Sequence, residues 1–258
     1  MFENRPLLWT GDFHTHSKYS DGRASIEEMV DAARSKGLKN IAITDHGPAN
    51  IGTGVKKSDT YLKIKEEINQ LQQKRPDIRI LTGAEADIIS CQGDIDISDE
   101  VVRELDILLV GLHPYVKPKS FIDGVNFVLG NQAAKLIPFF QSKVKNINTK
   151  ALVEALHKYP VTAVTHPGLG MPLDLKEVAR ACLATDTAFE INTGHNYQKS
   201  DDIKEVAKSG VSFIVNSDAH FTETVGYFDP GLALLKDANV PLEQIINLSD
   251  HGEDFFQN

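Results

Sequence analysis

The chain has 258 residues and an apolar fraction of 41%, which suits one packed (β/α) barrel or two ordinary domains. Its 27 lysines and arginines face 36 aspartates and glutamates, for a formal net charge of −9, and this acidic balance with scattered lysines disfavours nucleic acid as the main partner. No stretch approaches the roughly 18 apolar residues of a membrane span, and the N-terminus lacks the features of a signal peptide, so we expect a cytoplasmic protein with no membrane partner.

Strand-like apolar runs alternate with amphipathic helices along the chain. Seven runs are typical of strands, at 7–13, 40–44, 78–84, 106–112, 161–165, 187–191 and 211–217. Helices are expected at 25–37, 58–76, 148–160, 174–186 and 200–210, the first opening with Ser25 and Glu28 as a capping box. Strands that alternate with helices of about 10–15 residues indicate βαβ units and a parallel sheet. The sequence therefore predicts an α/β fold, with 1–258 as a single barrel-like domain.

One segment, at about 115–148, interrupts this alternation. It is too long for an ordinary connection between a strand and a helix, and it contains helical stretches with phenylalanines that we expect to be exposed. Because it follows His113, we interpret it as an insertion that forms a lid or a subunit contact. An inserted helix packed on the barrel is the alternative.

Side chains that bind metal follow the strand runs. Strand ends of a parallel barrel converge on one face, where the active site forms. Two cysteines far apart, Cys91 and Cys182, do not form a thiolate cluster and are expected to be free. The candidate metal ligands are instead six imidazoles and three carboxylates: His14, His16, Asp21, His46, Glu85, His113, His166, Asp218 and His220.

The spacing and number of these ligands favour a centre with more than one ion. In His14-Thr15-His16 both imidazoles lie on the same face, because strand side chains alternate with period two. Imidazole with carboxylate suits zinc, manganese or iron, and nine ligands exceed what one tetrahedral ion takes. They suffice for two or three ions if Glu85 bridges. Three divalent ions, three carboxylates and one hydroxide leave a formal charge of about plus two, which matches a phosphate monoester dianion.

Four further residues are candidates for a supporting role or a substrate contact. Asp45 precedes His46 and either orients a histidine or caps the following turn. Arg23 could pair with a phosphate through two hydrogen bonds, with simple solvent exposure as the alternative. Asn192 and His195 lie beyond the sixth strand run and could contact substrate.

The ligand-bearing stretches resemble those of the polymerase and histidinol phosphatase (PHP) family, in the stand-alone phosphoesterase branch. The resemblance covers roughly residues 10 to 228, in the family's order. It rests on FHTHSKYSDG at 13–22, ITDHG at 43–47, GAE at 83–85, GLHP at 111–114, THPG at 165–168, EIN at 190–192 and SDAH at 217–220. The resemblance implies a distorted TIM-like (β/α)7 barrel with a metal cluster at the strand C-terminal ends, and activity on phosphoesters with zinc, manganese or iron.

The resemblance also implies how the ligands divide among the ions. His14, His16, Glu85 and Asp218 would hold one ion, Glu85, His113 and His166 a second, and Asp21, His46 and His220 a third. The expected activity is hydrolysis of a small phosphomonoester by attack of a metal-bound hydroxide on phosphorus. Phosphodiesterase or 3′–5′ exonuclease activity, amidohydrolase activity and a non-catalytic metal-binding scaffold remain the alternatives.

Overall fold

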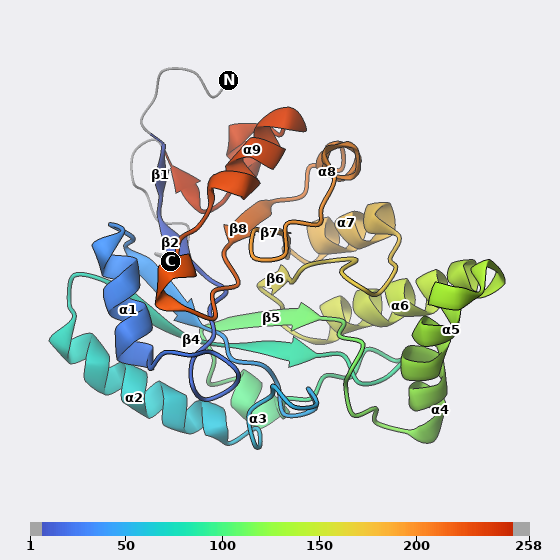
Figure 1. The fold of residues 1–258 in the computed structure, drawn as a ribbon, viewed down its shortest axis with the longest axis horizontal. Helices are drawn as coiled ribbons and strands as arrows, with labels where there is room; N and C mark the ends of the chain where they lie inside the picture. The colour runs from blue at the N-terminus through green and yellow to red at the C-terminus, as the bar shows by residue number, and fades with distance from the viewer. Residues whose placement is uncertain (1–6, 250–258) are drawn as a thin grey trace.

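The computed structural model describes residues 7–249 and contains a nearly closed barrel of parallel strands (Figure 1). The strands of the barrel follow one another around it in sequence order, β2-β3-β4-β5-β6-β7-β8. Their bounds are β2 Gly11–Asp12, β3 Asn40–Ile43, β4 Arg79–Asp87, β5 Ile107–Gly111, β6 Ala163–Val164, β7 Ala188–Asn192 and β8 Phe213–Asn216. This confirms the predicted (β/α)7 barrel.

The first and last barrel strands meet just beyond their ends. Thr15 and Ala219 form a parallel bridge, with the His16 N–H donating to the Ala219 carbonyl at 2.8 Å. Outside the barrel, β1 (Leu8–Trp9) pairs antiparallel with β9 (Leu248–Ser249). The run at 7–13 was therefore wrongly predicted as one strand: it forms β1 and β2, which belong to two different sheets.

Helices cover the outside of the barrel, and most lie where the apolar periodicity predicts them. The longer ones are α1 Ile26–Ser35, α2 Thr60–Lys74, α6 Pro138–Lys158, α7 Leu175–Ala184, α8 Ser200–Ala207 and α9 Asp229–Asp237. Shorter elements are α3 Asp99–Val102, η2 Thr222–Thr224 and η3 Leu242–Gln244. The capping box of Ser25 and Glu28 is present at the start of α1. Among the described residues, no helix is long and apolar enough to cross a membrane.

The segment at 115–148 forms a helical insertion on the side of the molecule toward which β4 and β5 point (Figure 1). It contains α4 Phe121–Asp123, the π-helical η1 Gly124–Leu129 and α5 Gly130–Leu136. The helix predicted at 148–160 begins ten residues earlier than expected, because Pro138 occupies its first turn and starts α6 inside the insertion. Phe121 and Phe139 are 87% and 86% exposed as expected, whereas Phe127 is buried.

Two apolar clusters stabilise the barrel, one inside it and one between its strands and the covering helices. A smaller cluster fills the inside and takes one or two residues from each strand or its end: Phe13, Ala42, Leu81, Ile107, Leu109, Ala163, Ala188 and Ile214. A larger cluster lies between the strands and the helices. In β3 the neighbours of Ala42, Ile41 and Ile43, belong to this outer cluster, as the alternation of strand side chains requires. Residues of the inner cluster come shortly before most candidate ligands in the sequence, so this cluster forms an apolar layer next to them inside the barrel.

Candidate metal centre

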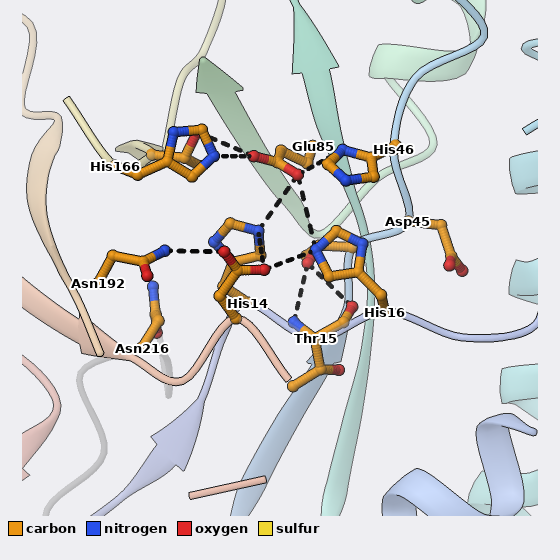
Figure 2. Close-up of polar contacts among 12 residues, drawn as sticks. His14, Thr15, His16, Asp45, His46, Glu85, His166, Asn192 and Asn216 are labelled. Atoms are coloured by element: carbon orange, nitrogen blue, oxygen red, sulfur yellow. Dashed lines mark hydrogen bonds and ion pairs between the residues drawn. The ribbon is translucent and has the colours of Figure 1, made fainter. Parts of the chain in front are cut away.

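The predicted ligands come together at the C-terminal ends of the barrel strands. Figure 2 labels five of them: His14, His16, His46, Glu85 and His166. Glu85 lies inside β4, and the others follow a strand: His14, His16 and Asp21 after β2, His46 after β3, His113 after β5, His166 after β6, and Asp218 and His220 after β8. Because all strands run parallel, their ends share one face of the barrel. The structure therefore brings all nine predicted residues to one place.

Glu85 lies at the middle of the cluster and is fully buried. Its Oε1 is 2.6 Å from His166 Nε2 and 3.4 Å from His113 Nε2. Its Oε2 is 2.7 Å from His46 Nδ1, 3.3 Å from His14 Nε2 and 3.6 Å from His16 Nε2. One carboxylate thus faces five imidazoles, the geometry expected of a bridging ligand.

The other two carboxylates complete the cluster. Asp218 Oδ1 lies 3.1 Å from His16 Nε2 and 3.5 Å from His14 Nε2. Asp21 Oδ2 lies 3.3 Å from His220 Nε2, and ligand atoms of Asp21, His16, His46 and His220 all fall within 4.8 Å of one another. The rings of His16 and His220 are stacked, with centroids 4.2 Å apart.

Several of these buried atoms make no hydrogen bond, although polar neighbours surround them. They are His14 Nε2, His16 Nδ1, His46 Nδ1 and Glu85 Oε2. His46 Nδ1 and Glu85 Oε2 are only 2.7 Å apart, yet they are not aligned for a hydrogen bond. Buried polar atoms normally have partners, so lone pairs that converge without one fit divalent cations. The donor set, imidazole with carboxylate, is that of zinc, manganese or iron.

The electrostatics of the cluster also favour cations. Burial alone would raise the pKa of Glu85, but His46, His14, His113 and His166 together lower it well below its usual range. Burial would likewise raise the pKa of Asp21, yet His220, His16 and His46 lower it to about 2. For His16, burial and the neighbouring His46 lower the pKa to about 4. The Glu85 and Asp21 carboxylates are therefore ionised near pH 7. Nearby carboxylates in turn raise the pKa of four other imidazoles against the effect of burial, those of His14, His46, His113 and His220. Bound cations would take the place of these protons.

Two ligands have unusual backbone conformations. His166 has φ +25° and Asp218 has φ +53°, values in or near the left-handed region that residues other than glycine rarely adopt. Such strain persists only where the surrounding structure maintains it, and it concentrates at functional sites. Both strained residues lie at the cluster, each two residues beyond the end of a barrel strand.

Two buried carboxylates outside the predicted set hold ligands from behind. Glu190 Oε1 lies 2.8 Å from His14 Nδ1, and Asp87 Oδ1 lies 2.5 Å from His113 Nδ1. Carboxylates commonly orient metal-binding histidines through the second ring nitrogen. Neither residue was predicted from the sequence to have this role. The available signal was a carboxylate within an apolar strand: Glu190 in TAFEI, and Asp87 two residues after Glu85, on the same face.

The four remaining predicted residues differ in their contacts. The Asp45 carboxylate accepts hydrogen bonds from Ser17 and Ser20, so it supports the loop that carries Asp21. The partners of this carboxylate are thus serines that precede it in the chain, and not a histidine or the following turn, the two roles considered for Asp45. Arg23 is exposed, and its backbone N–H donates to the His220 carbonyl at 2.8 Å.

Asn192 and His195 both lie beside Asp218. The Asn192 amide donates to Asp218 Oδ2 at 3.1 Å and to Glu190 Oε2 at 3.2 Å, and its Oδ1 accepts the His195 N–H. Asn192 is buried and these contacts are all to protein, and its predicted contact with substrate stays a prediction. The His195 side chain is 49% exposed, with Nε2 3.4 Å from Asp218 Oδ2.

Comparison with known proteins agrees with this geometry. The PHP domain family model matches residues 12–254. A probable phosphatase of Acetivibrio thermocellus is 29% identical, covering 92% of this chain and 90% of its own. A probable phosphatase of Caldanaerobacter subterraneus subsp. tengcongensis is 30% identical, covering 92% and 87%.

Solved structures show the same fold. A histidinol phosphate phosphatase of Lactococcus lactis, in complex with zinc, L-histidinol and phosphate, has a TM-score of 0.61 at 18% identity and covers 91% of this chain and 95% of its own. A putative histidinol phosphatase from Listeria monocytogenes has a TM-score of 0.62 at 18% identity and covers 84% of this chain and 97% of its own.

The barrel, the ligand cluster at its strand ends and the matched relatives together define a metal-dependent phosphoester hydrolase. Within that class, the chain belongs to the PHP domain family, whose model spans most of its length.

Proposed function

We propose that this protein is a phosphatase that hydrolyses a small phosphomonoester with two or three bound zinc, manganese or iron ions. The observation that carries the proposal is the Glu85 carboxylate within 3.6 Å of five imidazoles. A carboxylate so placed can bridge two ions. Bound divalent ions polarise phosphoryl oxygens and lower the pKa of water, the chemistry that phosphoester hydrolysis needs.

The distances support a division of the ligands among three positions. His14, His16, Glu85 and Asp218 would hold the first ion, and Glu85, His113 and His166 the second. Asp21, His46 and His220 would hold the third, where the Asp21 and His220 side chains are 26% and 27% exposed. Substrate would therefore approach from the side of the third position.

Formal charge favours a monoester over a diester. Three divalent ions and three carboxylates, with one hydroxide, leave about two positive charges. A phosphate monoester dianion neutralises that charge, whereas a diester carries only one negative charge.

Arg23 and His195 are the proposed substrate contacts. Arg23 is exposed and joined to His220 through its backbone, and a guanidinium can bind phosphate oxygens through two hydrogen bonds. His195 is half-exposed beside Asp218, within reach of a leaving group bound over the cluster. The Lactococcus lactis structure holds L-histidinol and phosphate, so phosphorylated amino alcohols are the first substrates to examine.

A substrate panel tests this proposal. Protein stripped of metal and reloaded with zinc, manganese or iron would be assayed on L-histidinol phosphate, sugar phosphates, nucleoside monophosphates, a p-nitrophenyl diester and single-stranded DNA. We expect monoesters to have the highest kcat/KM, with activity lost in the stripped protein. Preference for the diester or for DNA would reject the proposal in favour of the phosphodiesterase or exonuclease alternative.

A further inference from the structure

Glu190, in the middle of β7, is fully buried and accepts hydrogen bonds on both carboxylate oxygens. Oε1 accepts hydrogen bonds from His14 Nδ1 at 2.8 Å and from the Asn216 amide at 3.0 Å. Oε2 accepts hydrogen bonds from the backbone N–H of His166 at 2.6 Å and from the Asn192 amide at 3.2 Å. Four donors surround one carboxylate, and two of them belong to candidate metal ligands.

The contact with His14 determines which ring nitrogen is available to metal. A carboxylate only accepts, so His14 donates from Nδ1 and its neutral ring keeps a lone pair on Nε2. That Nε2 is the atom without a hydrogen bond that faces Glu85 and Asp218. Figure 2 shows Asn192 and Asn216 on one side of His14 and His16 on the other.

The contact with His166 acts on the backbone instead. His166 has φ +25°, a conformation that needs support from its surroundings. Its N–H donates to Glu190 Oε2, and its Nε2 reaches Glu85 Oε1 at 2.6 Å. The hydrogen bond to Glu190 therefore holds the backbone that aims this imidazole at the cluster.

We propose that Glu190 is a positioning residue for two metal ions at once: it fixes the His14 ring at the first and the His166 backbone at the second. Binding of the two ions is then linked through one carboxylate. The inference rests on the metal centre of the proposed function and concerns how that centre is assembled.

Asp87 provides a matched comparison within the same site. It is fully buried like Glu190, and its Oδ1 lies 2.5 Å from His113 Nδ1. Its contact thus reaches a candidate ligand of the second ion, and Oδ2 makes no hydrogen bond. Loss of the Asp87 charge should disturb one binding event, whereas loss of the Glu190 charge should disturb two.

Replacing Glu190 by glutamine keeps the shape but cannot satisfy four donors. If the new amide N–H faces His14, the ring moves its proton to Nε2 and loses the lone pair aimed at metal. If it faces His166, the strained backbone loses its acceptor. In either orientation the oxygen that remains is uncharged and holds its donors by weaker hydrogen bonds than a carboxylate does, so both contacts are affected. Asn216 cannot compensate by rotation of its amide, because its Oδ1 already accepts the Phe13 N–H at 3.1 Å.

The test is stepwise metal binding to stripped protein. Wild type, Glu190→Gln, Glu190→Asp and Asp87→Asn would be titrated with Zn²⁺ against a chromophoric chelator, and with Co²⁺ while recording its visible absorption. We expect Glu190→Gln to weaken two binding steps by about 10–100-fold, the usual effect of removing such a partner, and to alter the Co²⁺ spectrum. Asp87→Asn should weaken one step. Glu190→Asp keeps a carboxylate and should recover part of the affinity.

Thermal unfolding of the metal-free variants separates positioning from a general loss of folding. If Glu190→Gln does not fold, Glu190→Asp carries the test, with a smaller weakening of the same two steps. A Glu190 variant that is folded and changes one step or none would overturn the inference, as would wild type that binds fewer than two ions. Wild type that binds two linked ions but hydrolyses no phosphoester would instead reject the proposed function.

Discussion

The backbone N–H of Asp87 donates to Asp96 Oδ1 at 2.9 Å, which places the carboxyl group of the part-buried Asp96 near the buried Asp87 that contacts His113. Burial and the Asp87 charge raise the pKa of Asp96 to about 8, although hydrogen bonds from Ala49 and Asp87 oppose the shift. The folded protein then binds a proton at Asp96 that the unfolded chain, with a pKa near 3.8, releases.

This arrangement predicts a pH dependence of stability. The contribution of a protonated Asp96 is fully present below pH about 3.8 and is lost as the pH rises through about 8. We therefore expect Asp96→Asn to flatten the fall in the free energy of unfolding between pH 5 and 8. Urea unfolding of metal-free protein at several pH values measures it. An unchanged slope in the variant would contradict the assignment of this proton to Asp96.

Joint replacement of His14 and His16 by alanine should lower the metal content and abolish activity. His14 Nε2 and His16 Nε2 both face Glu85 and Asp218, so their loss removes two of the four expected ligands of the first ion. Elemental analysis and turnover of the purified variant provide the measurement. His157, outside the cluster on α6, offers a control in which the same substitution should change neither quantity.

Gly111→Ala should disturb the centre without replacing a ligand residue. A Cβ at Gly111 would lie 2.4 Å from Thr165 Oγ1 and 3.2 Å from His166 Cε1, and Thr165 donates to Glu85 Oε1. Overpacking of this kind is destabilising by about 1–3 kcal/mol, and we expect metal loss with it. Gly130→Ala is the control, because its Cβ meets atoms only at 3.4 Å and beyond. Equal metal content in both variants would argue against the expected displacement.

The insertion is predicted to affect substrate choice more than metal binding. None of the nine candidate ligands lies in 115–148, yet the segment follows His113 and is on the side toward which the strands point. Replacing 121–136 by a short flexible linker should alter relative rates across the substrate panel and leave the metal content unchanged. A Phe121→Ser, Phe139→Ser variant keeps the fold of the insertion and removes two exposed rings. Metal loss with unchanged relative rates would refute the prediction.

Hydrolysis is expected to invert configuration at phosphorus. Cys182 is buried, burial raises the pKa of its thiol to about 12, and Cys91 contacts Asn126 and Asp123 away from the cluster. Neither cysteine is thus placed to form a phosphoenzyme. We expect water to attack phosphorus directly, in line with the leaving group, and a single displacement of this kind inverts the configuration at phosphorus. Hydrolysis of a chiral, isotopically labelled monoester measures the outcome, and net retention would indicate a covalent intermediate.

Much of the site could be predicted because its ligands follow strands. A histidine or carboxylate at the end of an apolar run is visible in the sequence, and a parallel barrel brings such ends together. Glu190 and Asp87 could not be assigned in this way, since their roles depend on which imidazole nitrogen each faces. The supporting contacts of Asn192 and Asp45 depend likewise on packing. The start of α6 at Pro138 was not predicted. The apolar periodicity indicates a helix only from residue 148, whereas the helix begins inside the insertion.

The bridge between Thr15 and Ala219 also bears on the order in which the molecule is assembled. His14 and His16 are synthesised about two hundred residues before Asp218 and His220, and the two groups meet where the barrel closes. A nascent chain can thus pair its early strands on the ribosome but cannot complete the first ion's ligands until its last barrel strand has emerged. Because metal binding to such a site contributes to the free energy of folding, cation supply should influence the final closure of the barrel and the resistance of its two ends to proteolysis.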